Sequence, residues 1–167
     1  MDTVTPVTTR GGTPHIQKTM KSASRWLIHY LLGPRLARAV KLNIVLLENL
    51  KKTQGIIGDC TWTDDNVNPR EFEIRLDVSL TPYSRMLALS HELIHLKQYA
   101  KLELYDYQQN GLYPHYVRFQ KKQIDSSKIA YRKYPWEVEA YSNEKPVLMA
   151  WVNATNSHHL IKQRRDR

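Results

Sequence analysis

Apolar positions recur along this chain with a helical period in some segments and with a period of two in others. Residues 16–39 follow the helical period. The Gly33-Pro34 pair interrupts the pattern and predicts that this segment forms two helices. The residues before it, 1–15, are rich in Thr, Gly and Pro and poor in apolar side chains, so we expect a disordered lead-in. The helical period is set by Trp26, Leu27, Tyr30 and Leu31.

Three extended segments are predicted in the middle of the chain. Residues 42–47 are apolar enough for a buried strand, and residues 55–62 form a second candidate. Residues 71–78 alternate polar and apolar side chains, which is typical of a strand with one face in water. Turn-forming residues fill the gap between the last two segments. We therefore expect a small, mostly antiparallel three-stranded sheet.

The clearest helix begins at Thr81-Pro82, with Thr as the N-cap and Pro in the first helical position. It should run to about residue 102. Its predicted core stripe is Met86, Leu89, Leu93, Leu96 and Ala100.

Beyond this helix, residues 103–134 are polar and rich in tyrosine, which indicates either a functional loop or short helices. A last helix should begin at Pro135 and end near residue 152. The pattern as a whole predicts an α+β fold in a single domain over residues 16–153, followed by a basic, flexible tail over residues 154–167.

Size and composition limit the class of protein. The chain has 167 residues, of which 41% are hydrophobic, so it is expected to be globular with one core. Its one cysteine, Cys60, excludes an intrachain disulfide and a thiolate metal cluster, and is expected to be a small buried strand residue. The first residues lack a secretory signal, and the apolar runs are too short to cross a membrane. We expect a monomeric, cytoplasmic protein without a membrane partner.

The net charge of +9 is concentrated near the two ends of the chain. Residues 1–41 carry many cations and the single acid Asp2, and residues 162–167 are basic again. Solvated helix faces would explain these cations, and so would a surface that binds nucleic acid. The cations of the first segment are Arg10, Lys18, Lys21, Arg25, Arg35, Arg38 and Lys41.

The run Ser90-His91-Glu92-Leu93-Ile94-His95 lies within the predicted central helix. Positions four apart lie on the same face of a helix, so His91 and His95 can both turn a ring nitrogen to one metal ion. Glu92 is rotated by about 100° from His91, within reach of a water on that metal. This pattern of two ligands and a general base is typical of zinc hydrolases.

A catalytic zinc site usually has three protein ligands. The predicted last helix offers two carboxylates, Glu137 and Glu139. Residues two apart on a helix point roughly 200° away from each other, so only one of them can bind the same ion as the histidines.

The HExxH run, followed by a helix that carries Glu-x-x-Ala, resembles the gluzincin class of zinc metallopeptidases. The resemblance is closest to small phage-borne or SprT-like neutral metallopeptidases, and it covers residues 81–102 and 135–145, including the run Pro135-Trp136-Glu137-Val138-Glu139-Ala140. It implies a zincin-like fold with one zinc ion per chain and, if a phage encodes the protein, a location in the host-cell cytoplasm. By this resemblance the metal ligands are His91, His95 and Glu137, the last preferred to Glu139 because Ala140 follows it by three positions, and the general base is Glu92.

Two departures from the family pattern bear on the third ligand. Gluzincins often place Asp or Asn four residues after the ligand glutamate, where this chain has Tyr141. SprT-like proteins commonly use a third histidine, and His115 is the histidine between the two helices. Glu137, with Glu139 as the second choice, is therefore the candidate for the third position, and the SprT-like pattern adds His115.

Other side chains are candidates for supporting roles. An oxyanion donor is needed, and Tyr131, Tyr134 and Tyr141 lie near Glu137 in the sequence. Asp77 is expected either to hydrogen-bond a ligand imidazole or to cap a strand end. Gln98 is read as a polar helix residue and Trp136 as the anchor of the last helix in the core. In zincins the peptide lies along an edge strand of the sheet, which the resemblance places between residues 42 and 78.

The leading prediction is therefore a zinc endopeptidase that acts on a protein or peptide substrate. A second hypothesis is a basic, nucleic-acid-associated protein that keeps a zinc site but has little or no hydrolytic activity. A third is a virion or host-interaction protein that retains the fold alone.

Overall fold

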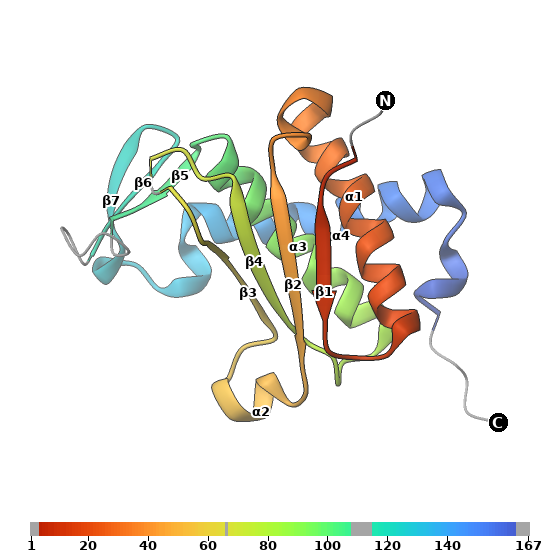
Figure 1. Ribbon diagram of the computed structural model, residues 1–167. Helices are drawn as coiled ribbons and strands as arrows, with labels where there is room; N and C mark the ends of the chain where they lie inside the picture. The colour runs from red at the N-terminus through yellow and green to blue at the C-terminus, as the bar shows by residue number, and fades with distance from the viewer. Residues whose placement is uncertain (1–3, 66, 108–114, 163–167) are drawn as a thin grey trace.

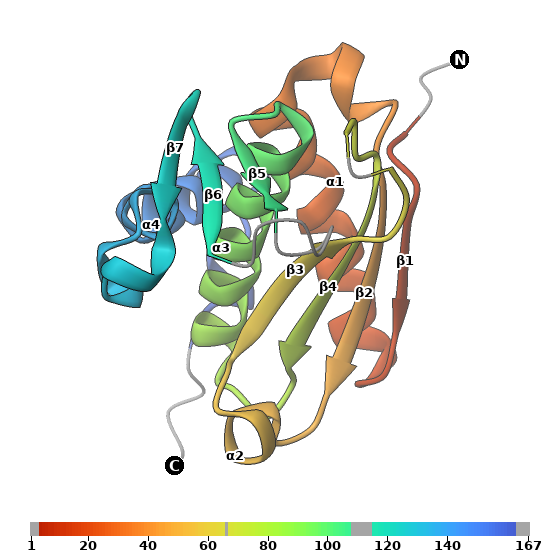
Figure 2. The ribbon, with the colours of Figure 1, turned by 90° about the vertical axis from the view of Figure 1, so that its left-hand side faces the viewer.

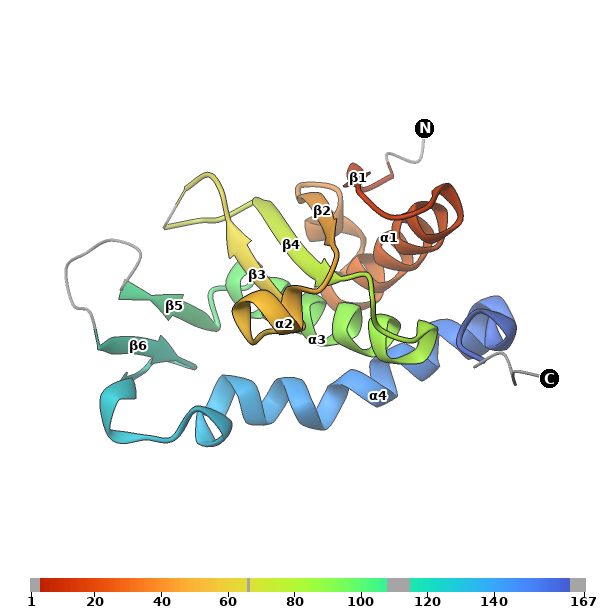
Figure 3. The same cartoon turned by 90° about the horizontal axis from the view of Figure 1, so that it is seen from below.

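The computed structural model describes residues 4–65, 67–107 and 115–162. A sheet in the order β1-β2-β4-β3 forms one layer (Figure 1). Two helices, α1 (Pro14–Ala37) and α3 (Pro82–Ala100), cover one face of this sheet, and α4 (Pro135–Thr155) packs on α3 from the far side (Figure 3). The strands are β1 (Val7–Arg10), β2 (Lys41–Leu47), β3 (Gly58–Trp62) and β4 (Glu71–Asp77).

The α+β class is confirmed, but the predicted three-stranded, mostly antiparallel sheet is wrong. The sheet is four-stranded and mixed. β2 pairs in parallel with both β1 and β4, and only β3 runs antiparallel, beside β4. After β2 the chain forms the short helix α2 (Leu50–Gln54) and then β3, which is the edge strand of the sheet. The next strand, β4, lies between β2 and β3. The local sequence pattern predicted where β2, β3 and β4 lie along the chain, but it did not predict which strands pair with each other.

The strand β1 overturns the prediction of a disordered lead-in for residues 4–15, and residues 1–3 of that segment lie outside the described residues. Val7 is buried, and its strand pairs with β2 from Val7↔Leu42 to Arg10↔Val45. The chain then turns into α1 through Gly11, whose φ is +80°. A Cβ on Gly11 would lie 2.1 Å from the carbonyl oxygen of Leu46, so this close approach requires glycine.

The predicted helices are present. Thr13 caps α1, and Gly33 interrupts it with a φ of 76°, as the Gly33-Pro34 pair predicted. Thr81 caps α3 by accepting a hydrogen bond from the amide of Ser84, and Pro82 occupies the first turn. All members of the predicted core stripe of α3 are buried: Met86, Leu89, Leu93, Leu96 and Ala100.

A second, smaller sheet follows α3, within the segment for which a loop or short helices were expected. It consists of β5 (Leu104–Asp106), β6 (Tyr116–Phe119) and β7 (Lys122–Asp125), all antiparallel (Figure 2). The short 3-10 helices η2 (Ser126–Lys128) and η3 (Tyr131–Lys133) lead from it to α4. Trp136 is buried against this sheet in a second apolar cluster, with Leu104, Val117 and Phe119.

The last described residues fold back onto the protein. α4 begins at Pro135 as predicted and is followed by the 3-10 helix η4 (His158–Leu160). Ser157 is buried, and Leu160 and Ile161 pack against the main core, so this part of the predicted flexible tail is ordered. The rest of the tail, residues 163–167, lies outside the described residues. Within the described part of the chain, no helix has both the length and the apolar content of a membrane-spanning segment.

Candidate metal centre

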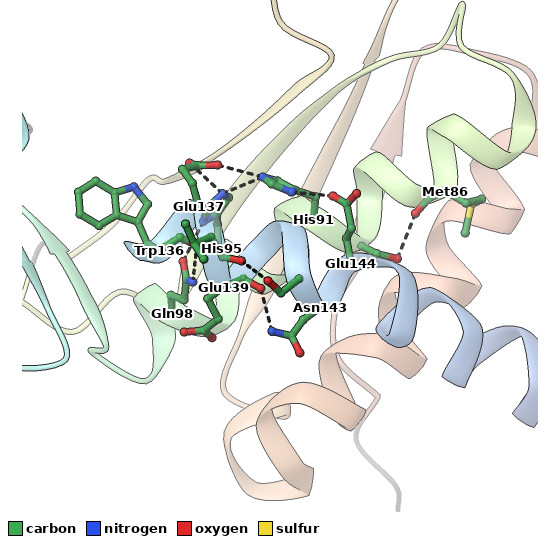
Figure 4. Close-up of polar contacts among 12 residues, drawn as sticks. Met86, His91, His95, Gln98, Trp136, Glu137, Glu139, Asn143 and Glu144 are labelled. Atoms are coloured by element: carbon green, nitrogen blue, oxygen red, sulfur yellow. Dashed lines mark hydrogen bonds and ion pairs between the residues drawn. The ribbon is translucent and has the colours of Figure 1, made fainter. Parts of the chain in front are cut away.

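Three side chains from α3 and α4 converge on one point (Figure 4). The Nε2 atoms of His91 and His95 lie 3.1 Å apart. The carboxylate of Glu137 contacts both, with Oε2 3.3 Å from His91 Nε2 and Oε1 3.3 Å from His95 Nε2. All three residues are buried, and their candidate ligand atoms lie within 4.8 Å of one another.

The packing of α4 on α3 creates this arrangement. His91 and His95 lie one turn apart on α3, so their rings leave the helix on the same side. Glu137 stands in the first turn of α4, where the exposed amide groups of a helix favour a carboxylate. Ala140, one turn later and fully buried in the core, allows α4 to lie close to its neighbours.

Both imidazoles are held by acceptors on their Nδ1 atoms. Oε2 of Glu144 lies 2.9 Å from Nδ1 of His91, and the amide oxygen of Gln98 lies 2.8 Å from Nδ1 of His95. A carboxylate and an amide oxygen can only accept, so each Nδ1 must carry a proton. In the neutral imidazoles the Nε2 lone pairs therefore face one another and Glu137.

Such a cluster of acceptors can hold a cation at its centre. Among the described residues, Oε2 of Glu137 is buried and has no hydrogen-bond donor. Burial lowers the pKa of His91 and of His95, but the neighbouring carboxylates, Glu137 first and then Glu92, together outweigh it and raise both values. Burial raises the pKa of Glu137, but the two imidazoles bring it down to about 2. Two neutral imidazoles and one carboxylate are a donor set that suits a divalent metal ion.

Glu92 lies beside the three candidate ligands. It is buried, and burial is the main reason why the pKa of its carboxyl group rises to about 7. Its Oε1 approaches Gly58 on β3 so closely that a Cβ there would lie 3.2 Å away. A cavity of about 130 Å³ is lined by Glu92 together with His95 and Glu137. The carboxyl group of Glu92 can therefore exchange a proton with a molecule bound in this cavity.

The structure separates the two carboxylates of the last helix. Glu137 faces the imidazoles, whereas Glu139 points away and pairs with Nζ of Lys97 at 2.7 Å (Figure 4). His115 is exposed just before β6 and does not belong to the cluster. The third position is thus occupied by Glu137, and its role as a ligand stays a prediction.

The three candidate tyrosines have different surroundings. Tyr131 lines the cavity beside Glu137, and burial followed by the Glu137 charge raises its pKa. Tyr141 packs its ring 4.6 Å from the ring of His91, in the place where the family pattern has Asp or Asn. Tyr134 is directed elsewhere, since its hydroxyl donates to the carbonyl oxygen of Ser126. Of these three tyrosines, Tyr131 is the one that lines the cavity.

Asp77 takes the second of its two expected roles. Its carboxylate accepts hydrogen bonds from the amides of Lys51 and Ser79 at the end of β4. Burial raises its pKa, but the donated backbone hydrogen bonds outweigh burial and leave that pKa below the ordinary value. Asp77 thus caps a strand end and joins α2 to the sheet.

Two residues that orient the histidines were missed. Gln98 was read as an ordinary polar residue, yet it also donates to the carbonyl oxygen of Trp136 and so links α3 to α4. It follows His95 by three positions on the same helix face, which is a signal available in the sequence. Glu144 follows Glu137 by two helical turns, so it also lies on the face of α4 that looks at α3.

In comparisons with known proteins, no family model, no curated protein and no solved structure matches this chain. The geometry alone establishes a buried group of His91, His95 and Glu137 that can hold a metal ion. It also places the carboxyl group of Glu92 at the same cavity.

Proposed function

We propose that this protein is a zinc-dependent metallopeptidase of the gluzincin type. The observation that carries the proposal is the convergence of the buried His91, His95 and Glu137 side chains. Beside them lies the buried carboxyl group of Glu92, which is not one of the three candidate ligands. His91, His95 and Glu137 supply two nitrogen donors and one oxygen donor, the set found in catalytic zinc sites with an open position. A zinc ion held there supplies a Lewis acid and lowers the pKa of water to about 7.

Glu92 acts as the general base in this mechanism. Its pKa of about 7 lies near neutral pH, where a carboxylate can both take up a proton and return it. It takes a proton from the attacking water and then passes that proton to the nitrogen of the leaving amine. Tyr131 donates a hydrogen bond from its hydroxyl group to the oxygen of the carbonyl under attack.

The sheet supports a peptide as the substrate. β3 is an edge strand, and within the described residues no strand pairs with its outer side. Gly58, Asp59 and Cys60 of this strand line the same cavity as Glu92 and Glu137. An extended peptide that adds to β3 by backbone hydrogen bonds would carry a carbonyl group to the metal centre. A side chain at Gly58 would crowd the carboxyl group of Glu92, because its Cβ would lie 3.2 Å from Oε1.

The test combines metal analysis with hydrolysis of an unfolded protein substrate. Wild type should bind one zinc ion per chain and cleave the substrate. Glu92→Gln should retain the zinc and lose activity by about 100-fold or more. Glu137→Ala should lose the zinc, whereas the matched variant Glu139→Ala should keep both zinc and activity, because Glu139 pairs with Lys97 instead.

Two outcomes would contradict the proposal. Wild-type protein that binds no zinc refutes the metal centre. Zinc-loaded Glu92→Gln that cleaves at the wild-type rate refutes the assigned mechanism.

A further inference from the structure

A groove of about 1050 Å³ runs along α1 at the edge of the sheet formed by β1. Most of its lining comes from α1, and Val4 and Thr5 before β1 and Thr155 at the end of α4 complete it. The sheet order is β1-β2-β4-β3, so this edge is opposite to the edge strand β3 at the metal centre (Figure 1). The groove is therefore a separate site that the proposed peptidase reaction does not use.

The charge of this groove has one sign. Lys18, Lys21 and Arg25 stand at helical spacing on α1, and Arg38 lies just past its end. Residues 4–41 contain no Asp or Glu. Among the described residues, none of these four cations takes part in an ion pair. The groove thus presents uncompensated positive charge, which attracts a polyanion.

Two aromatic rings lie among these cations. The rings of Trp26 and Tyr30 stack with centroids 5.1 Å apart and planes inclined by 15°. Tyr30 is 57% exposed, so its side chain is not held in the core. Both residues line the groove. The pair offers a flat aromatic surface within reach of the cations.

We propose that this groove binds single-stranded nucleic acid. Lys18, Lys21 and Arg25 neutralise successive phosphates, and an unstacked base lies on the ring of Tyr30. An acidic peptide would use the cations but not the stacked rings. A duplex is read by an element that enters one of its grooves, whereas this surface is hollow. The alternation of cations with an exposed stacked pair fits a single strand best.

The experiment measures the fluorescence anisotropy of a labelled oligothymidylate of about 12 nucleotides, using the full chain. Wild type should bind with an affinity that falls as salt rises. Tyr30→Ala should weaken binding by roughly 5- to 100-fold, because it removes a stacked base, while Tyr30→Phe should bind as wild type.

The cations are tested by a charge-matched pair of variants. The double variant Lys21→Ala with Arg25→Ala should bind more weakly and reduce the salt slope by about 0.7 for each phosphate that is no longer neutralised. The double variant Lys52→Ala with Lys122→Ala removes the same charge from exposed positions outside the groove and should bind as wild type. Glu92→Gln should also bind as wild type, which separates this site from the metal centre.

The proposal is overturned if the groove variants bind as tightly as wild type, or if both double variants weaken binding equally. It is also overturned if wild type prefers a DNA duplex, polyglutamate or anionic lipid vesicles to the single strand. The melting temperature of each variant shows that it is folded. Failure of these tests leaves the peptidase proposal untouched, because the two sites share no residue.

Discussion

The acceptor that holds His91 offers a sharp test of the metal centre. Oε2 of Glu144 lies 2.9 Å from Nδ1 of His91, and the Glu144 side chain is 18% exposed. Glu144→Ala removes this acceptor and lets the ring rotate or change tautomer. Glu144→Gln keeps an oxygen that can accept from Nδ1 and removes only the negative charge.

The expected size of the effect follows from the role of Glu144 as a support for a metal-binding imidazole. Loss of such a partner typically lowers metal affinity by about 10- to 100-fold, or about 1.4 to 2.7 kcal/mol. Glu144→Ala should fall in this range. Glu144→Gln should lose less than about 10-fold, because the hydrogen bond that fixes the tautomer remains.

Competition with a chromogenic chelator measures the zinc affinity of each variant. The shift in melting temperature on adding zinc provides a second readout, because a ligand stabilises the folded state according to its affinity. The matched control is Glu139→Ala, which removes a carboxylate from the same helix but one that pairs with Lys97. Wild-type affinity in Glu144→Ala, or an equal loss in Glu139→Ala, would refute the assigned role of Glu144.

Three further predictions concern residues around the site. Tyr131→Phe should lower kcat by about 100-fold with little change in KM, because only the hydroxyl of the transition-state donor is removed; an unchanged kcat contradicts this. Gly58→Ala should lower both activity and the free energy of unfolding, the latter by about 1 kcal/mol, since its Cβ would lie 2.9 Å from Cδ2 of Leu76; a denaturant melt checks it. Asp77→Asn should destabilise the protein by about 1 to 2 kcal/mol at pH 7. The pKa of Asp77 is lowered on folding, so this difference should persist above about pH 4 and vanish at lower pH, as acid melts would show.

Local sequence determined the helices and the positions of the strands. Thr81-Pro82 and Pro135 mark helix starts, and Gly33 marks a break, because each acts through its own backbone or the next turn. The placement of His91, Glu92 and His95 on one helix was predictable for the same reason. These features depend on residues a few positions apart, whose geometry a helix fixes.

Strand partners were decided by tertiary structure. The segment that forms β4 gave a clear alternating pattern, but nothing in it shows that β2 is its parallel neighbour. β1 is short and lies in a segment of low apolar content, and pairing with β2 makes it a strand. Strand pairing joins segments far apart in the chain, so local propensity does not specify the partner or its direction.

The candidate site shows the same division. Helix geometry alone required that only one of Glu137 and Glu139 face the histidines, and the packing of α4 on α3 selected Glu137 by turning Glu139 to Lys97. The same packing brings Glu144 to His91. The sequence by itself thus determined a pair of imidazoles and a carboxyl group on one helix. Only the tertiary structure decided the third acceptor and its supports, because they depend on how two helices rotate against each other.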